Sequence, residues 1–447
     1  MSWPDGHRGA RVGPHHAEGE PIGPPTRAIF ANAAQVVTCA GAARGRRGVE
    51  MSDAVIRSDV AVAINGSAVE AVGAFDELAA RIPSARVVDC ERGVLTPGFV
   101  DSHTHAVFGK PRFEEQELRA TGMDYMEIAR RGGGIHASVR DLRARDEASL
   151  TDLARAHLRR LAAHGVTTVE IKSGYGLTLE DELKSLRVIR RLADELPLRL
   201  VPTFLGAHEI PLEYREAPRT RTEYVDLLVH DMIPVVAAEG LATFADVFCE
   251  TGVYTAAESR RILEAARASG LALKLHADEL TSSGGAELAA SIGATSADHL
   301  AAISDAGIAA LAGAATVATL LPGTMLFLGK TAHAPARRLI QSGVPVALAT
   351  DFNPGTSPTT NFPLVLSLGV SQLRMSAAEA LIAGTVNAAA ALGLAHRVGQ
   401  IAPGFAADLA LFDVSDAREL PYWYGDHRCR ATWVGGKPCY TSELGLS

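Results

Sequence analysis

Several features that mark other classes of protein are absent from this chain of 447 residues. Its five cysteines are scattered and none belongs to a Cys-x-x-Cys pair. This argues against a disulfide framework and indicates a reducing compartment, so we expect a cytoplasmic protein. No apolar run reaches the roughly 18 residues of a membrane span. The formal net charge of −8 comes without a long basic run, so neither nucleic acid nor a membrane is an expected partner.

The N-terminal segment also lacks an apolar stretch of the kind found in signal peptides. Residues 1–27 are instead rich in Gly, Pro, His and Arg. Such a composition cannot bury a core, so we expect a disordered extension over 1–27.

The two ends of the remaining chain share a pattern typical of β-strands. Short apolar runs are separated by turn signals such as Asn65-Gly66, and the pattern returns after Gly399–Gly404. The sequence therefore predicts a small β-sandwich domain formed from both chain ends, residues 28–93 and 396–447. The apolar runs that carry this prediction are Ala34–Cys39, Val60–Ile64, Val69–Val72 and Asp408–Val414.

Residues 94–395 alternate between strand-like and helix-like segments. Several strand candidates are nearly continuous apolar runs, as in parallel strands buried on both faces, and helical periodicity separates them. This α/β pattern predicts a (β/α)8 TIM-like barrel, although an open doubly wound sheet also fits the alternation. No Gly-x-Gly-x-x-Gly follows the first strand, which disfavours dinucleotide binding. The candidates are Val94–Val100, Val166–Lys172, Leu198–Leu205, Ala245–Glu250, Leu271–His276, Thr295–His299, Thr316–Leu321 and Val344–Asp351.

The first of these strands leads into His103-Thr104-His105. Side chains two residues apart share one face of a strand, so both imidazoles could face one metal ion. A His-x-His pair alone is common by chance. The interpretation therefore depends on what stands at the ends of the other strands.

Polar residues recur where the predicted strands end, which is where barrels of this type carry their catalytic side chains. His276 and Asp351, together with His103 and His105, form a mixed nitrogen and oxygen set that suits zinc or iron with a position open to water. Water at such a site is acidified, and Asp351 could accept its proton. Any one of these histidines alone is more often a core or surface residue, and Asp351 could instead cap a turn.

These residues lie in stretches that resemble the amidohydrolase superfamily and, more narrowly, the imidazolonepropionase family. The combination of Ser-Gly-Tyr-Gly with Thr-Asp-Phe-Asn-Pro-Gly is the most specific part, and the resemblance extends over the whole predicted barrel. The stretches that carry it are Thr96–Gly109, Arg112, Gly132–Ile135, Glu170–Leu177, Thr203–His208, Leu275–Glu279, Ser296–His299 and Ala349–Gly355.

The resemblance implies hydrolysis of the ring amide of 4-imidazolone-5-propanoate to N-formimino-L-glutamate, a step of histidine degradation. It implies one Zn²⁺ or Fe³⁺ per subunit, and we expect a homodimer. The implied metal ligands are His103, His105, His276 and Asp351, and the implied catalytic residues are Asp351, Glu279 and His299. The implied substrate contacts are Arg112, Tyr175, His208, Glu279, Asn353, Gly355 and Thr356.

Alternatives remain open at this point. His276-x-x-Glu279 also fits an aminohydrolase of nucleobases or related heterocycles, which ammonia release would reveal. A catalytically silent metal-binding barrel is a second alternative, and the retention of Asp351 and Glu279 argues against it. Lys172 could be carbamylated and bridge two metals, or could pair with Glu170 or another barrel carboxylate. Cys249 is interpreted as a packing residue.

Overall fold

The structure is a computed structural model that describes residues 27–123, 127–128, 132–215 and 218–442. The predicted extension of 1–27 lies outside the described residues except for Arg27, which begins a strand. Among the described residues, every helix is too short or too polar to cross a bilayer.

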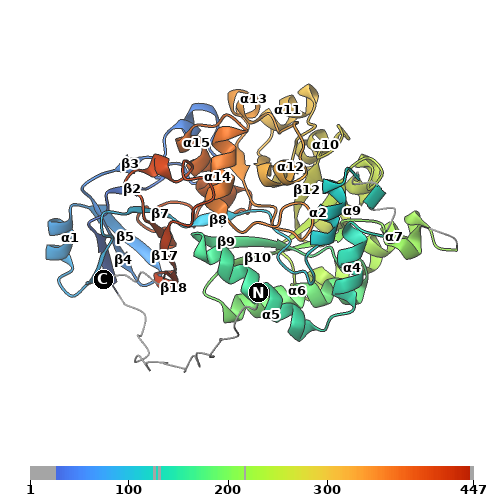
Figure 1. Ribbon diagram of the computed structural model, residues 1–447, viewed down its shortest axis with the longest axis horizontal. Helices are drawn as coiled ribbons and strands as arrows, with labels where there is room; N and C mark the ends of the chain where they lie inside the picture. The colour runs from blue at the N-terminus through green and yellow to red at the C-terminus, as the bar shows by residue number, and fades with distance from the viewer. Residues whose placement is uncertain (1–26, 124–126, 129–131, 216–217, 443–447) are drawn as a thin grey trace, which may run out of the picture.

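An eight-stranded parallel sheet forms the centre of the larger part of the molecule (Figure 1). Its strands follow one another in chain order, each paired with the next, as in a (β/α)8 barrel. The predicted barrel is therefore confirmed, and the first predicted strand is corrected, because Val94–Pro97 belongs to another sheet. The barrel strands are β8 (Phe99–Asp101), β9 (Val166–Lys172), β10 (Arg199–Ala207), β11 (Phe244–Cys249), β12 (Ala272–Ala277), β13 (Ser296–His299), β14 (Val317–Leu320) and β15 (Val346–Leu348).

Loop and side-chain contacts join the first strand of the barrel to the last. The carboxylate of Asp101 accepts hydrogen bonds from the backbone N–H of Thr350 at 3.0 Å and from its hydroxyl at 2.6 Å. Thr104 and Phe352 form a parallel bridge just beyond the strands. The segments that follow β8 and β15 are thus held side by side at the carboxyl rim of the barrel.

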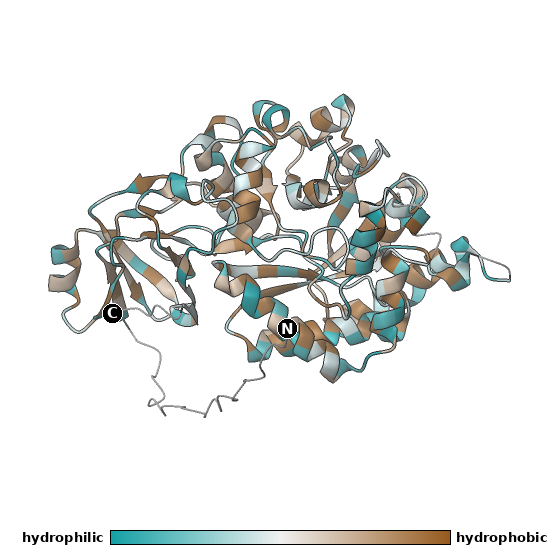
Figure 2. Ribbon diagram, in the orientation of Figure 1, coloured by the Kyte–Doolittle hydropathy of each residue, from teal (hydrophilic) through white to brown (hydrophobic). Residues whose placement is uncertain are grey.

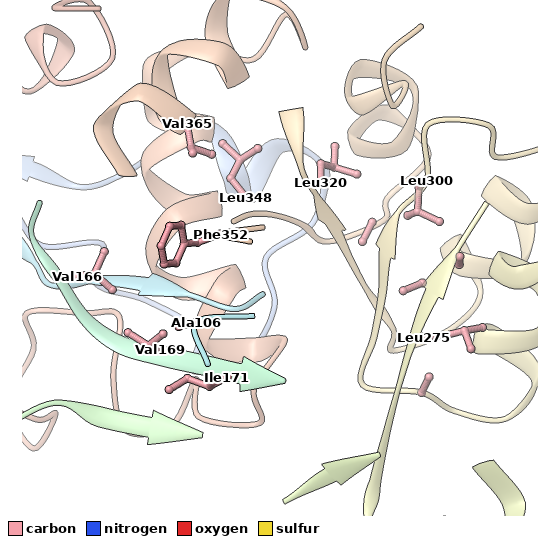
Figure 3. Packing of buried hydrophobic residues seen from close by; sticks show 14 of the residues in the cluster. Ala106, Val166, Val169, Ile171, Leu275, Leu300, Leu320, Leu348, Phe352 and Val365 are labelled. Atoms are coloured by element: carbon pink, nitrogen blue, oxygen red, sulfur yellow. The ribbon is translucent and has the colours of Figure 1, made fainter. Parts of the chain in front are cut away.

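Helices surround the barrel, and their apolar faces pack onto the strands. Val365 of α14 faces Leu348 of β15 (Figure 3), and the helices alternate hydrophobic with hydrophilic residues (Figure 2). Thr178 begins the long helix α6 by accepting a hydrogen bond from the Asp181 N–H, as N-cap residues do. The elements are α2 (Phe113–Ala120), α4 (Ile135–Arg143), α5 (Glu147–Ala163), α6 (Leu179–Glu195), η2 (Leu212–Tyr214), α7 (Arg221–Leu227), η3 (Leu228–Met232), α8 (Ile233–Ala238), α9 (Ala256–Ala268), α10 (Gly285–Ser291), α11 (Asp305–Ala312), α12 (Pro322–Phe327), α13 (Ala336–Gln341), α14 (Phe362–Ser371), α15 (Ala377–Ile382), η4 (Ala383–Asn387) and α16 (Ala388–Ala390).

Two further sheets, built from both ends of the described chain, pack face to face beside the barrel (Figure 1). Phe30 of one sheet meets Trp433 of the other edge to face, with ring centroids 4.9 Å apart. One sheet has the order β5 (Ala68–Gly73), β4 (Ala61–Asn65), β1 (Arg27–Ala31), β6 (Arg86–Asp89), and the other has β18 (Lys437–Thr441), β17 (Cys429–Val434), β16 (Leu409–Phe412), β7 (Val94–Pro97), β2 (Gln35–Val37), β3 (Ile56–Arg57). The short helices of this part are η1 (Gly48–Ser52), α1 (Phe75–Arg81) and η5 (Ala417–Glu419).

A single glycine separates the sandwich from the barrel. Gly98 lies between β7 of the sandwich and β8 of the barrel, and its N–H donates to the Asp408 carbonyl at 2.9 Å. A Cβ at Gly98 would overlap the side chain of Thr167. The chain can change sheets here because glycine permits this close approach.

Candidate metal centre and active site

Three histidines and one aspartate converge at the carboxyl rim of the barrel. His103 and His105 follow β8, His276 lies on β12, and Asp351 follows β15. The three histidines each offer a ring nitrogen within 4.8 Å of the others. Asp351 Oδ1 lies 3.5 Å from His103 Nε2 and 3.6 Å from His105 Nε2. The structure therefore brings together the four residues that the sequence proposed as ligands.

The chemistry of this cluster fits a metal ion. The Nε2 atoms of His103 and His276 are buried and have no hydrogen-bond partner among the described residues, although buried polar atoms normally have one. Burial, helped by the positive charge of Lys172, lowers the pKa of His103 well below its ordinary value, and burial likewise lowers the pKa of His105. Neutral imidazoles with free nitrogens are the form in which histidine binds a metal.

The fourth member, Asp351, is held by the loop that carries it. Its N–H donates to the His103 carbonyl at 3.0 Å, and the His105 N–H donates to the Phe352 carbonyl at 2.8 Å. The Thr324 hydroxyl donates to Asp351 Oδ2 at 2.5 Å. Burial raises the pKa of Asp351 to about 6, while the bond from Thr324 opposes this shift. Asp351 is thus a carboxylate with one oxygen fixed and the other facing the histidines.

His299 and Glu279 adjoin the cluster. His299 forms a second possible ligand group with His103 and Asp351, and its Nε2 lies 3.6 Å from Glu279 Oε2. Burial, with the nearby charges of Asp351 and Glu250, raises the pKa of Glu279 well above its ordinary value. Burial lowers the pKa of His299 well below its ordinary value. A carboxyl group with a raised pKa and an imidazole with a lowered pKa therefore lie side by side.

A buried guanidinium faces the loop after Asp351. Arg112 is 7% exposed, and its Nε and Nη1 atoms have no hydrogen-bond partner among the described residues. Its nearest carboxylate oxygen, Glu115 Oε2, lies 3.7 Å from Nε. The Arg112 N–H donates to the Pro354 carbonyl at 3.1 Å, and a Cβ at Gly355 would overlap the guanidinium. Such a guanidinium is available to a carboxylate of a ligand.

The side chain of Asn353 is engaged within its own loop. Its Oδ1 accepts hydrogen bonds from the N–H groups of Gly355 at 2.9 Å and Thr356 at 2.7 Å. Its Nδ2 donates to the Asp351 carbonyl at 2.7 Å. Asn353 therefore shapes the turn that places Gly355 against Arg112, and the substrate contact that the resemblance implies for Asn353 stays a prediction.

Aromatic side chains line another side of the cluster. The His105 and His208 rings are stacked with centroids 5.0 Å apart, and Tyr175 lies 5.3 Å from His208. Burial lowers the pKa of His208 to about 3, so this imidazole is neutral. The carboxylate of Glu182 holds the Tyr175 loop by accepting from the N–H groups of Gly174, Gly176 and Leu177. These aromatic rings form an apolar wall beside the cluster.

A layer of charged residues lies one step deeper in the barrel. Lys172 donates to Glu170 Oε1 at 3.0 Å and to Asp246 Oδ2 at 2.7 Å, and Lys274 donates to Glu170 Oε2 at 2.7 Å. Burial alone would lower the pKa of Lys172, but Asp246, Glu170 and Asp298 raise it above its ordinary value. The contacts of Lys172 with Glu170 and Asp246 match the alternative in which this lysine pairs with barrel carboxylates.

Sequence reasoning missed three residues of this region. Asp246 and Lys274 stand in apolar strand segments, and neither was proposed for a role. A charged residue within a strand buried on both faces is itself a signal, and Lys274 precedes His276 by two positions, so both point into the barrel. Thr324 lies on α12 and had no sequence signal, because its contact with Asp351 depends on how α12 packs.

An eight-stranded barrel with a histidine and carboxylate cluster at its carboxyl rim is the arrangement of the amidohydrolase class, and the Amidohydrolase family model matches residues 110–440. Solved structures agree at the level of the fold. A zinc-bound adenosine deaminase from Xanthomonas campestris superposes with a TM-score of 0.67 at 19% identity, with 92% of each chain covered. The guanine deaminase of E. coli gives 0.68 at 17% identity, covering 94% of this chain and 100% of that one.

Sequence comparison gives a narrower assignment. The imidazolonepropionase of Geobacillus kaustophilus is 48% identical over 417 residues, which cover 92% of this chain and 97% of the relative. That of Symbiobacterium thermophilum is 48% identical over 90% of this chain and 94% of its own length. The chain belongs to the imidazolonepropionase family of amidohydrolases.

Proposed function

We propose that this chain hydrolyses the ring amide of 4-imidazolone-5-propanoate to N-formimino-L-glutamate in histidine degradation. The observation that carries the proposal is the placement of Arg112 against the loop that follows Asp351 of the cluster. The buried guanidinium has two nitrogens without a hydrogen-bond partner among the described residues. A substrate with a planar ring and an acidic side chain complements both. The proposal includes one Zn²⁺ or Fe³⁺ per subunit and a cytoplasmic homodimer. It also includes a division of the chain into an N-terminal extension that ends before β1, a two-part sandwich that takes in β7, and a barrel that begins after Gly98.

His103, His105, His276 and Asp351 would hold the metal. When bound, such an ion supplies Lewis acidity that lowers the pKa of water toward neutrality. Nitrogen ligands with one carboxylate suit either zinc or iron. The neutral state of His103 and His105 keeps their lone pairs available, since a protonated imidazole cannot be a ligand.

Asp351 and Glu279 carry out the proton transfers of hydrolysis, and His299 orients the substrate. Asp351 accepts the proton of the attacking water, because its Oδ1 faces the cluster. The water oxygen bonds to the ring carbonyl carbon, and the ring C–N bond then breaks. Glu279, whose pKa is raised chiefly by burial, donates a proton to the leaving nitrogen. His299, beside Glu279, orients the carbonyl oxygen with its ring N–H.

Other residues of the site would bind the substrate. Arg112 pairs with the propanoate carboxylate in a charge-assisted contact, and Gly355 leaves room for the guanidinium. Tyr175 and His208 pack against the ring, and Thr356 offers a hydroxyl group at the same turn, where it lies 2.9 Å from Asn353 Nδ2.

The test is an assay on freshly made imidazolonepropanoate combined with metal analysis of the purified protein. We expect the imidazolone absorbance to fall without release of ammonia, at a rate proportional to metal content. Ammonia release from cytosine or guanine, with imidazolonepropanoate left intact, would favour the aminohydrolase alternative. Binding without turnover of any cyclic amide would favour a silent barrel.

A further inference from the structure

Two histidines of the cluster, His103 and His276, each contact a deeper carboxylate through Nδ1. His103 Nδ1 lies 2.7 Å from Asp298 Oδ2, and His276 Nδ1 lies 2.9 Å from Asp246 Oδ2. Asp246 Oδ1 also accepts from the His276 backbone N–H at 3.1 Å. The hydrogen bond to Asp298 fixes the proton of His103 on Nδ1 and leaves the lone pair on Nε2. Asp246 lies beside His276 Nδ1 at ion-pair distance and favours the same tautomer. The Nε2 atoms are those that face the cluster.

One ammonium group connects the two carboxylates. Lys172 Nζ lies 2.7 Å from Asp246 Oδ2 and 3.5 Å from Asp298 Oδ2. Lys172, Asp246 and Asp298 are at most 1% exposed, so water cannot replace the contacts that one of them loses. Without Lys172, the Asp246 carboxylate would lose its 2.7 Å contact with a cation and would no longer be fixed beside His276.

We propose that Lys172 is a positioning residue for the metal: through Asp246 and Asp298 it holds His276 and His103 in the tautomer and orientation that bind the ion. The inference rests on the metal site of the proposed function. In this role Lys172 acts as a buried cation. A carbamylated Lys172 would instead bridge two metal ions.

Lys274 provides a matched control within the same layer. It is also completely buried, and it donates to Glu170 and to the Ser102 carbonyl at 2.9 Å. Its distance to Asp298 Oδ2 is 3.8 Å, and no contact with Asp246 is found among the described residues. Removal of Lys274 takes the same charge from the barrel but leaves the short contact of Asp246 with a cation in place.

The experiment measures the metal affinity of metal-free protein by competition between the protein and a chromophoric chelator for Zn²⁺. Lys172→Met should weaken binding about 10- to 100-fold, the usual cost of losing a residue that orients a metal ligand. Lys274→Met should cause a clearly smaller loss. The visible absorption of the Co²⁺-loaded Lys172→Met protein should also differ from that of the unaltered chain, since the coordination geometry changes.

The outcomes separate this inference from the proposed function. An unaltered chain that binds no metal would remove the proposed function itself. A folded Lys172→Met variant with unaltered affinity, or an equal loss in Lys274→Met, would overturn only the role of Lys172. If Lys172→Met fails to fold, the isosteric Asp246→Asn variant decides: weaker Zn²⁺ binding supports the inference, and unaltered binding overturns it.

Discussion

Two adjacent layers of buried polar side chains lie at the carboxyl rim of the barrel and just below it. They differ in whether their polar atoms have partners within the protein. In the deeper layer, Lys172 and Lys274 lie within 4 Å of the carboxylates of Glu170, Asp246 and Asp298. In the rim layer, ring nitrogens of His103 and His276 and guanidinium nitrogens of Arg112 have no partner among the described residues. Both layers are buried: the deeper residues are at most 1% exposed, and His103, His276 and Arg112 are at most 7% exposed. The paired charges of the deeper layer therefore fix the side chains around them, whereas the unpaired nitrogens of the rim layer remain available to a metal ion or a substrate.

Among changes in the rim layer, we expect His276→Ala to cause the largest loss of metal and activity. Loss of a ligand should exceed the 10- to 100-fold typical of residues that merely orient one. We expect metal content and activity to disappear together, measured by elemental analysis and by the imidazolone assay. A variant that retained metal with full activity would remove His276 from the centre.

Asp351→Asn tests the proton acceptor of the same layer. The amide cannot accept the proton of water, so kcat should fall about 10²- to 10⁴-fold, the usual contribution of a general base. Part of the metal should remain, because the three histidines are intact. Steady-state kinetics on protein of known metal content separates the two effects, and a kcat near that of the unaltered chain would contradict the assignment.

Arg112→Ala should mainly raise KM. A charged hydrogen bond is worth about 1.5–3 kcal/mol, which corresponds to an increase in KM of roughly 10- to 100-fold. Metal content should not change. A substrate analogue without the carboxylate serves as the control, since the variant and the unaltered chain should handle it alike. Unchanged KM for the natural substrate would remove the assigned role.

Gly355→Ala tests the packing of the loop against the Arg112 guanidinium. The added methyl group would overlap Arg112, so KM should rise in the same direction as in Arg112→Ala, by about tenfold or less because the charge can shift. Gly313→Ala is the matched control, because a Cβ at Gly313 meets its nearest atom, the Ala310 carbonyl oxygen, at 3.7 Å. Equal kinetics for the two variants would contradict the proposed packing.

Lowering the pH should weaken metal binding through protonation of Asp351, and this is the smallest effect that we expect. The pKa of Asp351 is raised to about 6, chiefly by burial, so the group is ionised above that pH and protonated below it. Metal binding requires the ionised form. Zn²⁺ uptake by metal-free protein should therefore weaken by about tenfold per pH unit as the pH falls below about 6. Circular dichroism should show an intact fold over this range, and uptake independent of pH would contradict the prediction.

The sequence was sufficient to predict the barrel and the four proposed ligands because parallel strands bring their carboxyl ends to one rim. His103 and Asp351 are 248 positions apart in the chain yet meet there, as the strand-end rule requires. The deeper layer was predicted only through Lys172 and Glu170. Asp246 lies in the middle of β11, and its contacts with Lys172 and His276 depend on the register between strands, which no local pattern reveals.

The passage through Gly98 has a consequence for how the molecule could be divided. His103 follows that glycine by five positions, and β7, just before it, is clamped between β2 and β16 from opposite ends of the chain. A shortened protein that began at Val94 would leave this strand without the β2 neighbour. The loosened strand would lie only a few residues before His103 and would disturb its position. The sandwich sheets therefore help to fix the first histidine of the rim.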